Sequence, residues 1–349
     1  MVFKELLLEN KKQINEFLNR NNGHILQSYE WGDLRLKEGH IVKRYALVSE
    51  VDEIKVYCQL VFHKLPKWYP SKSKYVGEVW RGPVVSDEIN HSELVEFLGK
   101  LKEVSRELNP VFIKFEPKII ETSKLKNPFS DVCVRGEETF IPCTANLNLD
   151  RTLDEIQSAF DKYTRKNIRK AEKKGVTVKI FDSRQHQLDA IKRAYGLLRG
   201  TSQRAGFRIR GQKFYEDLVD IQDEYVKMYV VEASVEGKIA ASYITLTMGN
   251  TIYTPYSGSD RSMSEFKAND IINWELIKLA KTLGLKKYDQ WGVLPLDAPL
   301  NNSMWGVTNF KMGFGGERER YIGAYDLVLC PKDYKLFSFA WRVRKMLKK

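Results

Sequence analysis

The charged side chains best placed to bind a ligand are concentrated in the stretch DKYTRKNIRKAEKKG, residues 161–175. It holds two acids, Asp161 and Glu172, against seven cations, which are Lys162, Arg165, Lys166, Arg169, Lys170, Lys173 and Lys174. One or two cations near a helix C-terminus interact favourably with the negative end of the helix dipole, but like charges three and four residues apart repel one another. A polyanion such as RNA, DNA or an anionic lipid explains the excess, because each neutralised phosphate releases counterions. The alternative is a solvated charged face.

The glycine-dense stretch FKMGFGGE, residues 310–317, predicts a tight turn whose backbone N–H groups suit an anion. The sequence has no P-loop and no GxGxxG after a strand, and neither half carries the Q/R-x-x-G-x-G/A loop with which acetyltransferases hold acetyl-CoA. Four cysteines without a CxxC pair and five histidines without an HExxH spacing predict neither disulfides nor a zinc site. We therefore predict no metal and no cofactor.

Composition indicates a globular protein with a basic bias. The chain has 349 residues, 57 Lys and Arg against 45 Asp and Glu, and a net charge of +12. This length is enough for two domains, and the charge favours an anionic partner, although a generally basic soluble protein is the simpler alternative. The N-terminus is too charged for a signal peptide and no run of 18 apolar residues exists, so a cytoplasmic protein is expected.

Helical and strand-like segments alternate along the chain, which predicts an α/β (α+β) fold. Two passages repeat the order strand, turn, helix, strand, with helices expected at 91–108 and 268–283 and strands at 111–117 and 286–292. Gly82 to Phe115 and Gly258 to Trp291 both span 33 residues, as an internal duplication would leave. A single helix is expected from Thr152 to Gly175, with the boundary between the halves at about 145–152.

Six stretches together resemble the FemX/FemA/FemB peptidoglycan-bridge aminoacyltransferases. In chain order they are QSYEWGDLR (27–35), RGPVV (81–85), TRKNIRKAEKKGV (164–176), RAGFRIRGQKFYEDL (204–218), KKYDQWGV (286–293) and NFKMGFGGE (309–317). The resemblance implies two tandem acetyltransferase-like (GNAT) domains with mixed sheets flanked by helices. The first would comprise 1–146 and 318–349, and the second 147–317. The span 184–225 has no sustained heptads, so the chain resembles the compact FemX type without a coiled-coil arm.

The resemblance also implies a reaction, in which an amino acid passes from aminoacyl-tRNA to the stem-peptide amine of UDP-MurNAc-pentapeptide or lipid II. The basic helix would bind the acceptor arm of the tRNA through its phosphates. Because the tRNA ester is already activated, positioning and charge stabilisation suffice, and no nucleophilic triad is required. Lys311 matches the family lysine proposed to stabilise the developing negative charge. An ordinary surface lysine is the alternative.

The other candidates are substrate contacts. Phe310 is expected to stack on the terminal adenine or to fill the core, and Asp289 to accept a proton or to orient a loop. Arg35, where the FemX type usually has lysine, and Arg210, with Arg208 as competitor, would contact the diphosphate. Tyr215, preferred to Phe214 because it has a hydroxyl, and Tyr256 would contact the substrate. Trp31 is expected to pack beneath the site.

The C-terminal segment 336–349 is predicted to be an amphipathic helix. Its apolar face would carry Leu336, Phe337, Ala340, Trp341, Val343 and Leu347. Such a helix fits either docking on the first domain or contact with the inner face of the membrane, and the two are compatible. We expect a monomer. Two other functions are left open: an acyltransferase of this fold with another amine acceptor, and a non-enzymatic RNA-binding protein.

Overall fold

The computed structural model describes residues 1–67, 69–122 and 127–346, and side chains up to residue 343. It divides into two compact units, one of residues 1–140 with 321–349 and the other of residues 141–320. The sequence boundary at 146 falls within strand β8 (Cys143–Asn148). That strand pairs with β13 (Lys287–Val293) and β14 (Glu317–Arg320), so its hydrogen bonds place it wholly in the second unit.

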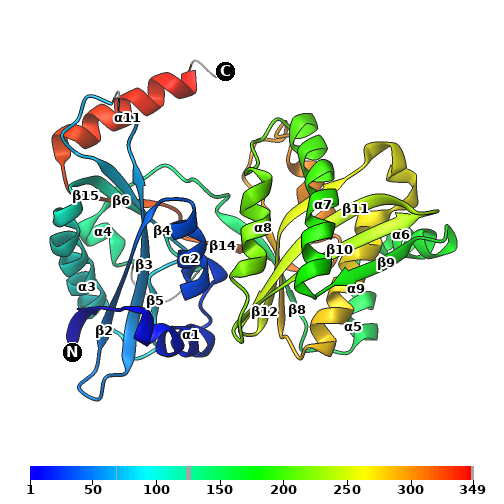
Figure 1. The fold of residues 1–349 in the computed structure, drawn as a ribbon, viewed down its shortest axis with the longest axis horizontal. Helices are drawn as coiled ribbons and strands as arrows, with labels where there is room; N and C mark the ends of the chain where they lie inside the picture. The colour runs from blue at the N-terminus through cyan, green and yellow to red at the C-terminus, as the bar shows by residue number, and fades with distance from the viewer. Residues whose placement is uncertain (68, 123–126, 347–349) are drawn as a thin grey trace. The chain divides into compact units, whose positions relative to one another are not determined.

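The first unit is a mixed sheet in the order β1-β2-β3-β4-β6-β15-β7, with β5 paired to β3 (Figure 1). Its strands are β1 (Val2–Glu5), β2 (Ile41–Val48), β3 (Ile54–Lys64), β4 (Tyr75–Trp80), β5 (Val84–Val85), β6 (Pro110–Glu116), β7 (Val134–Arg135) and β15 (Tyr325–Val328). Its helices are α1 (Lys11–Arg20), α2 (Tyr29–Lys37), α3 (His91–Val104), α4 (Phe129–Val132) and α11 (Pro331–Met346).

The core of this unit lies between the sheet and α3. Phe97 and Leu101 of α3 are fully buried and join a cluster with Val56 of β3 and Phe115 of β6. Neighbouring strand residues point to opposite faces, so Phe112 of β6, whose ring packs against α11, faces away from α3.

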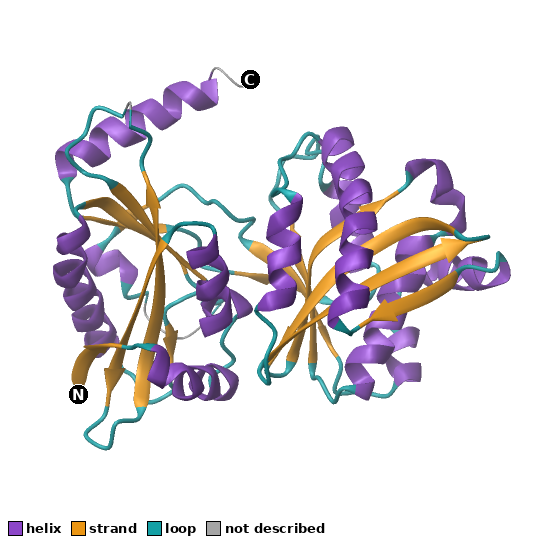
Figure 2. Ribbon diagram, in the orientation of Figure 1, coloured by secondary structure: helices purple, strands orange, loops and turns teal. Residues whose placement is uncertain are grey.

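The second unit holds a seven-stranded sheet in the order β14-β8-β13-β12-β11-β10-β9, and Figure 2 shows helices on both of its faces. Its remaining strands are β9 (Thr177–Phe181), β10 (Val226–Val235), β11 (Lys238–Met248) and β12 (Thr251–Ser259). Its helices are α5 (Leu153–Ser158), α6 (Lys162–Lys173), α7 (Arg184–Ala205), α8 (Gln212–Asp220), α9 (Ala268–Thr282) and α10 (Trp305–Met312), with a 3-10 helix η4 (Arg261–Phe266).

The two units share a topology that matches the repeat seen in the sequence. In the first, β3 pairs antiparallel with β4, α3 follows, and β6 returns parallel to β4. In the second, β11 pairs antiparallel with β12, α9 follows, and β13 returns parallel to β12. The α/β fold and its mixed, helix-flanked sheets are therefore as predicted. Among the described residues, no helix combines the length and apolarity needed to cross a lipid bilayer.

Candidate functional site

The basic segment forms two helices rather than the single helix expected from 152 to 175. Thr152 caps α5 through a capping box with Glu155, and α5 ends at Ser158. Asp161 then caps α6, because its carboxylate accepts a 2.6 Å hydrogen bond from the Thr164 N–H. The sequence prediction missed this break because the apolar residues keep a helical spacing across it. Asp161, an N-cap residue type three residues before Thr164, is the sequence signal for the start of a second helix.

The seven cations of this segment separate into two groups. Arg165 donates to the backbone oxygens of Ser158 and Phe160. Lys174 pairs with Glu265, and Lys170 is half-buried. The other four are exposed and recur at intervals of four, three and four residues, which places Lys162, Lys166, Arg169 and Lys173 in one row along the helix. We call these four residues the basic row.

The beginning of α6 is built against the segment 310–317. The Asp161 N–H donates to the carbonyl oxygen of Gly313 at 2.8 Å, and the Phe160 ring packs edge-on against Phe314 at 5.2 Å. A Cβ on Gly313 would lie 2.6 Å from Thr164 Oγ1. Gly315, at φ +73, would place a Cβ 2.6 Å from the carbonyl oxygen of Ala159. The glycines therefore serve close packing, and they bring the two most distinctive motifs of the sequence into contact.

Lys311 lies on the last turn of α10 and points into the second unit. Its ammonium Nζ donates a 2.9 Å hydrogen bond to the carbonyl oxygen of Gly292 in β13. Burial lowers the pKa of Lys311 from 10.5 to about 8, and the opposing charge of Asp289 offsets only part of that effect. Lys311 is thus a largely protonated, poorly solvated cation at neutral pH. A charge in such surroundings stabilises a nearby anion more strongly than one in water.

Asp289 supports the turn beside Lys311. Its Oδ1 accepts a 2.7 Å hydrogen bond from the Trp291 N–H and another from the Thr144 hydroxyl. Trp291 has a left-handed φ of 67°, a conformation that is costly for a bulky residue and that these bonds hold in place. The carboxylate is 2% exposed. This geometry fits the orienting role better than the proton-accepting one.

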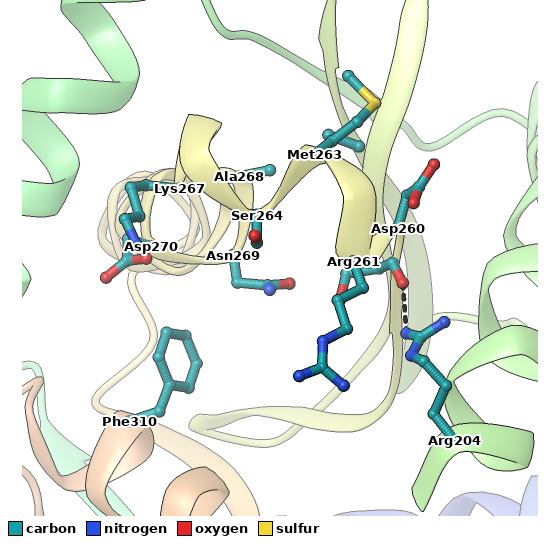
Figure 3. A pocket seen from close by; sticks show the side chains of 12 residues that line it. Arg204, Asp260, Arg261, Met263, Ser264, Lys267, Ala268, Asn269, Asp270 and Phe310 are labelled. Carbon is teal, nitrogen blue, oxygen red and sulfur yellow. Dashed lines mark hydrogen bonds between the residues drawn. The ribbon is translucent and has the colours of Figure 1, made fainter.

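A cavity of about 310 Å³ opens between η4, the start of α9 and Phe310 (Figure 3). Figure 3 shows Phe310 and Asp270 at one end of it and Arg204 and Arg261 at the other. Arg204 and Arg261 are both exposed, and Arg204 is anchored by a 2.7 Å hydrogen bond to the Ser259 carbonyl oxygen. The Phe310 ring is half-buried and packs edge-on against Phe314, at 5.5 Å between centroids.

Asp260 and Asp270 are the acidic residues that line this cavity, and Asp270 was not predicted from the sequence. Burial raises its pKa from 3.8 to about 6, although Asn167 of α6 donates to its Oδ1 at 3.1 Å. It stands in the first turn of α9, where acetyl-CoA enzymes need backbone N–H groups for pyrophosphate. A carboxylate there disfavours that ligand. The sequence could have pointed to Asp270 only as an acid in the first turn of the helix that follows Lys267, and acids are common in the first turns of helices.

Three of the predicted substrate contacts lie together in the second unit. Tyr215 of α8 packs edge-on against Tyr256 of β12 at 5.1 Å, and Phe214 lies 6.0 Å from Tyr256. The Arg210 guanidinium lies 5.4 Å from the Phe214 ring and is exposed. Burial raises the pKa of Tyr215 to about 12, so its hydroxyl stays protonated. Arg208 is exposed as well.

Arg35 lies in the first unit and is not presented to solvent. Its side chain is 1% exposed, forms an ion pair with Glu38 and lies 5.2 Å from the Trp80 ring. A diphosphate contact needs an accessible guanidinium, so we leave Arg35 out of the candidate site. The nearby Trp31 is buried, as expected of a packing residue.

Comparison with known proteins gives concordant matches. Residues 10–131 match the FemAB family, and residues 158–302 match an acetyltransferase (GNAT) domain. The lipid II:glycine glycyltransferase of Staphylococcus epidermidis is 23% identical over 388 residues, covering 90% of each chain. The crystal structure of FemX superposes with a TM-score of 0.81 at 20% identity, covering 96% of this chain and 99% of that one. A tandem GNAT protein of the clavulanic acid biosynthesis pathway gives a TM-score of 0.55 at 12% identity, covering 95% and 99%.

Proposed function

Because this chain belongs to the FemABX family and is an acyltransferase, we propose that it transfers an amino acid from aminoacyl-tRNA to the stem-peptide amine of a peptidoglycan precursor. One observation carries the proposal. The basic row, the cavity at Phe310 and the enclosed Lys311 ammonium are joined through the contacts between α6 and segment 310–317. These contacts support a proposal in which the basic row binds RNA and the neighbouring Lys311 ammonium stabilises an oxyanion.

The donor is proposed to lie along the second unit. The basic row extends over about 16 Å of helix, at 1.5 Å per residue, and suits the phosphates of an acceptor arm without reading its sequence. The terminal adenine would stack on Phe310, because the ring is half-exposed at the cavity wall and aromatic stacking tolerates any base. Arg261 at the opposite end would balance a backbone phosphate.

The reaction joins the acceptor nitrogen to the carbonyl carbon and breaks the bond from that carbon to the ribose oxygen. Negative charge collects on the carbonyl oxygen as the amine attacks, and Lys311 is proposed to stabilise it. The proton of the amine ends on the departing ribose oxygen. Lys311 can act in this way only while protonated, which its pKa of about 8 allows at neutral pH.

The acceptor is proposed to contact Arg210, Tyr215 and Tyr256. Arg210 is exposed for a phosphate, and the Phe214 ring that it approaches also packs against the partly exposed Tyr256, which would contact the peptide. The name of the Staphylococcus epidermidis relative says that it acts on lipid II, so we favour lipid II over UDP-MurNAc-pentapeptide. A lipid-linked acceptor requires contact with a membrane, for which segment 336–349 is the candidate. The enzyme is proposed to act as a monomer.

The test is transfer of labelled amino acids from a mixed aminoacyl-tRNA pool. Lipid II and UDP-MurNAc-pentapeptide would be offered in separate reactions, each with and without prior RNase treatment, and mass spectrometry would identify the product. We expect label on at least one acceptor, lost after RNase. Tight tRNA binding with no label on either acceptor would contradict the assignment to cell-wall synthesis and favour another amine acceptor.

A further inference from the structure

Helix α11 has one face fixed to the first unit. The rings of Tyr334 and Phe337 both pack edge-on against Phe112 of β6, each at 5.2 Å. The Trp341 indole N–H donates to Glu137 at 3.0 Å, and its ring stacks on Phe337. Asp333, the one acid after residue 330, accepts a 2.6 Å hydrogen bond from the Ser73 hydroxyl. These contacts hold the helix in a defined rotation about its axis.

The apolar residues of α11 therefore do not form the single face expected from the sequence. Phe337 and Trp341, four residues apart, lie on the docked face, although Trp341 at its edge is still 47% exposed. Leu336, Phe339 and Val343 follow the helical repeat on the other side and are 37%, 67% and 38% exposed. Leu347 lies outside the described residues. We call Leu336, Phe339 and Val343 the outer apolar row. Figure 1 shows α11 at the margin of its unit, beyond the sheet.

Cations flank this row. Lys332, Lys335 and Arg342 are exposed. The sequence from 331 to 349 holds seven Lys and Arg against the single Asp333, whose carboxylate already faces the docked side. Exposed apolar side chains between cations, on a helix too short to span a bilayer, are the composition of a helix that lies in a membrane interface.

We infer that the outer apolar row and its flanking cations form a docking surface for an anionic lipid bilayer. A tRNA would use the cations but leave Leu336, Phe339 and Val343 in water. A second copy of the chain would cover the apolar row but oppose cations to cations. Only a bilayer with anionic headgroups both buries the apolar row and neutralises the cations, because the acyl chains contact the outer apolar row while the headgroups bind Lys335 and Arg342.

The inference extends the proposed function, because an enzyme held at the membrane by α11 meets a lipid-linked acceptor where that acceptor resides. Only this role in meeting a lipid-linked acceptor rests on the proposed function, whereas the lipid binding of α11 does not. Lipid binding and amino-acid transfer are measured separately, so either can fail while the other succeeds.

The test is co-sedimentation of the full chain with vesicles of phosphatidylcholine alone or of phosphatidylcholine with phosphatidylglycerol. Two double variants are compared with the native chain, Leu336→Ser with Phe339→Ser and Lys335→Ala with Arg342→Ala. The matched control is Val51→Ser, which removes an equally apolar residue of the same unit that is 83% exposed. Thermal unfolding verifies that every variant is folded.

We expect binding to the phosphatidylglycerol vesicles, weakened by added salt. The apolar double variant should bind at least about tenfold more weakly, given the free energy of burying a Leu and a Phe. Loss of two cations should weaken binding by roughly tenfold or more. Val51→Ser should bind like the native chain. Transfer to soluble UDP-MurNAc-pentapeptide, where it occurs, should be unchanged in the α11 variants.

Three results would overturn the inference. They are absence of native binding to either vesicle, equal binding by the apolar double variant, and a vesicle-independent effect of these substitutions on tRNA affinity or on the oligomeric state. The last would assign the surface to RNA or to a second copy of the chain.

Discussion

Replacing Lys311 with Met should make the protein more stable. The folded state lowers the pKa of this lysine from 10.5 to about 8. Each pKa unit corresponds to about 1.4 kcal/mol, so burial of the charged form costs about 3 kcal/mol. Methionine has a similar length and no charge to desolvate. Its one penalty is the lost hydrogen bond to the Gly292 oxygen, worth about 1 kcal/mol. Lys311→Met should therefore raise the free energy of unfolding by about 2 kcal/mol at pH 7.

The lowered pKa of Lys311 also makes the free energy of unfolding depend on pH. Between about pH 8 and 10.5 the unfolded chain keeps the lysine proton that the folded chain has released. Stability therefore rises with pH across this window, and the contribution of Lys311 is lost from the Met variant. Other groups titrate there as well, but they are common to both proteins. The advantage of the variant should accordingly shrink as pH rises from 7 to 10.

The assay is urea unfolding of both proteins at pH 7 and at pH 10, followed by tryptophan fluorescence. Lys227→Met on β10, where the native lysine is exposed, is the matched control and should change stability little at either pH. A Lys311→Met variant less stable than the native chain at pH 7 would refute the reasoning. So would an advantage that is the same at both pH values, because the lysine would then not be desolvated as its surroundings indicate.

Other predictions concern the donor surface and its support. The double variant Lys166→Glu with Arg169→Glu should weaken tRNA binding strongly, and the slope of log binding constant against log salt concentration should become shallower by about one unit per lost phosphate contact. The control Lys227→Glu should change neither the affinity nor the slope. An unchanged salt slope in the double variant would mean that the RNA binds elsewhere. The raised pKa of Asp270 implies stability that is present below about pH 4 and lost as pH rises to about 6, so Asp270→Asn should raise the unfolding free energy at pH 7 by up to about 3 kcal/mol and remove that dependence. Thermal unfolding profiles that are equal for the native chain and the Asp270→Asn variant at every pH from 4 to 7 would contradict this prediction. Gly315→Ala should destabilise the protein by about 1 kcal/mol or more in urea unfolding, because of its φ of +73 and the close Ala159 oxygen, and a neutral result would mean that the turn relaxes at no cost.

Local patterns predicted much of the fold. The apolar spacing of the helix at 268–283 and the strand at 286–292 reproduces α9 and β13 to within a residue. The break between α5 and α6 escaped prediction because the apolar spacing continues across it, and although Asp161 is a local N-cap signal, its bond to Gly313 joins residues far apart in the sequence. Local periodicity carries no information of that kind.

The candidate site divides in the same way. Residue type and motif pointed to Lys311, Phe310 and the basic helix, but not to which cations of that helix are engaged within the fold. The burial of Arg35 depends on Glu38 and Trp80, and the cavity acid Asp270 is made distinctive only by the surface that encloses it. Burial and enclosure are tertiary properties, so residue types alone could not supply them.

The proposed transfer mechanism depends most on Lys311 acting in the chemical step. The most direct measurement is the single-turnover rate of amino-acid transfer from bound aminoacyl-tRNA to saturating acceptor, for the native chain and for Lys311→Met. Removal of one donor to a developing oxyanion costs about 10²–10³ in rate. We predict a loss of that size with unchanged tRNA affinity and with a folded, more stable variant. A folded Lys311→Met variant that transfers at the native rate would contradict the account.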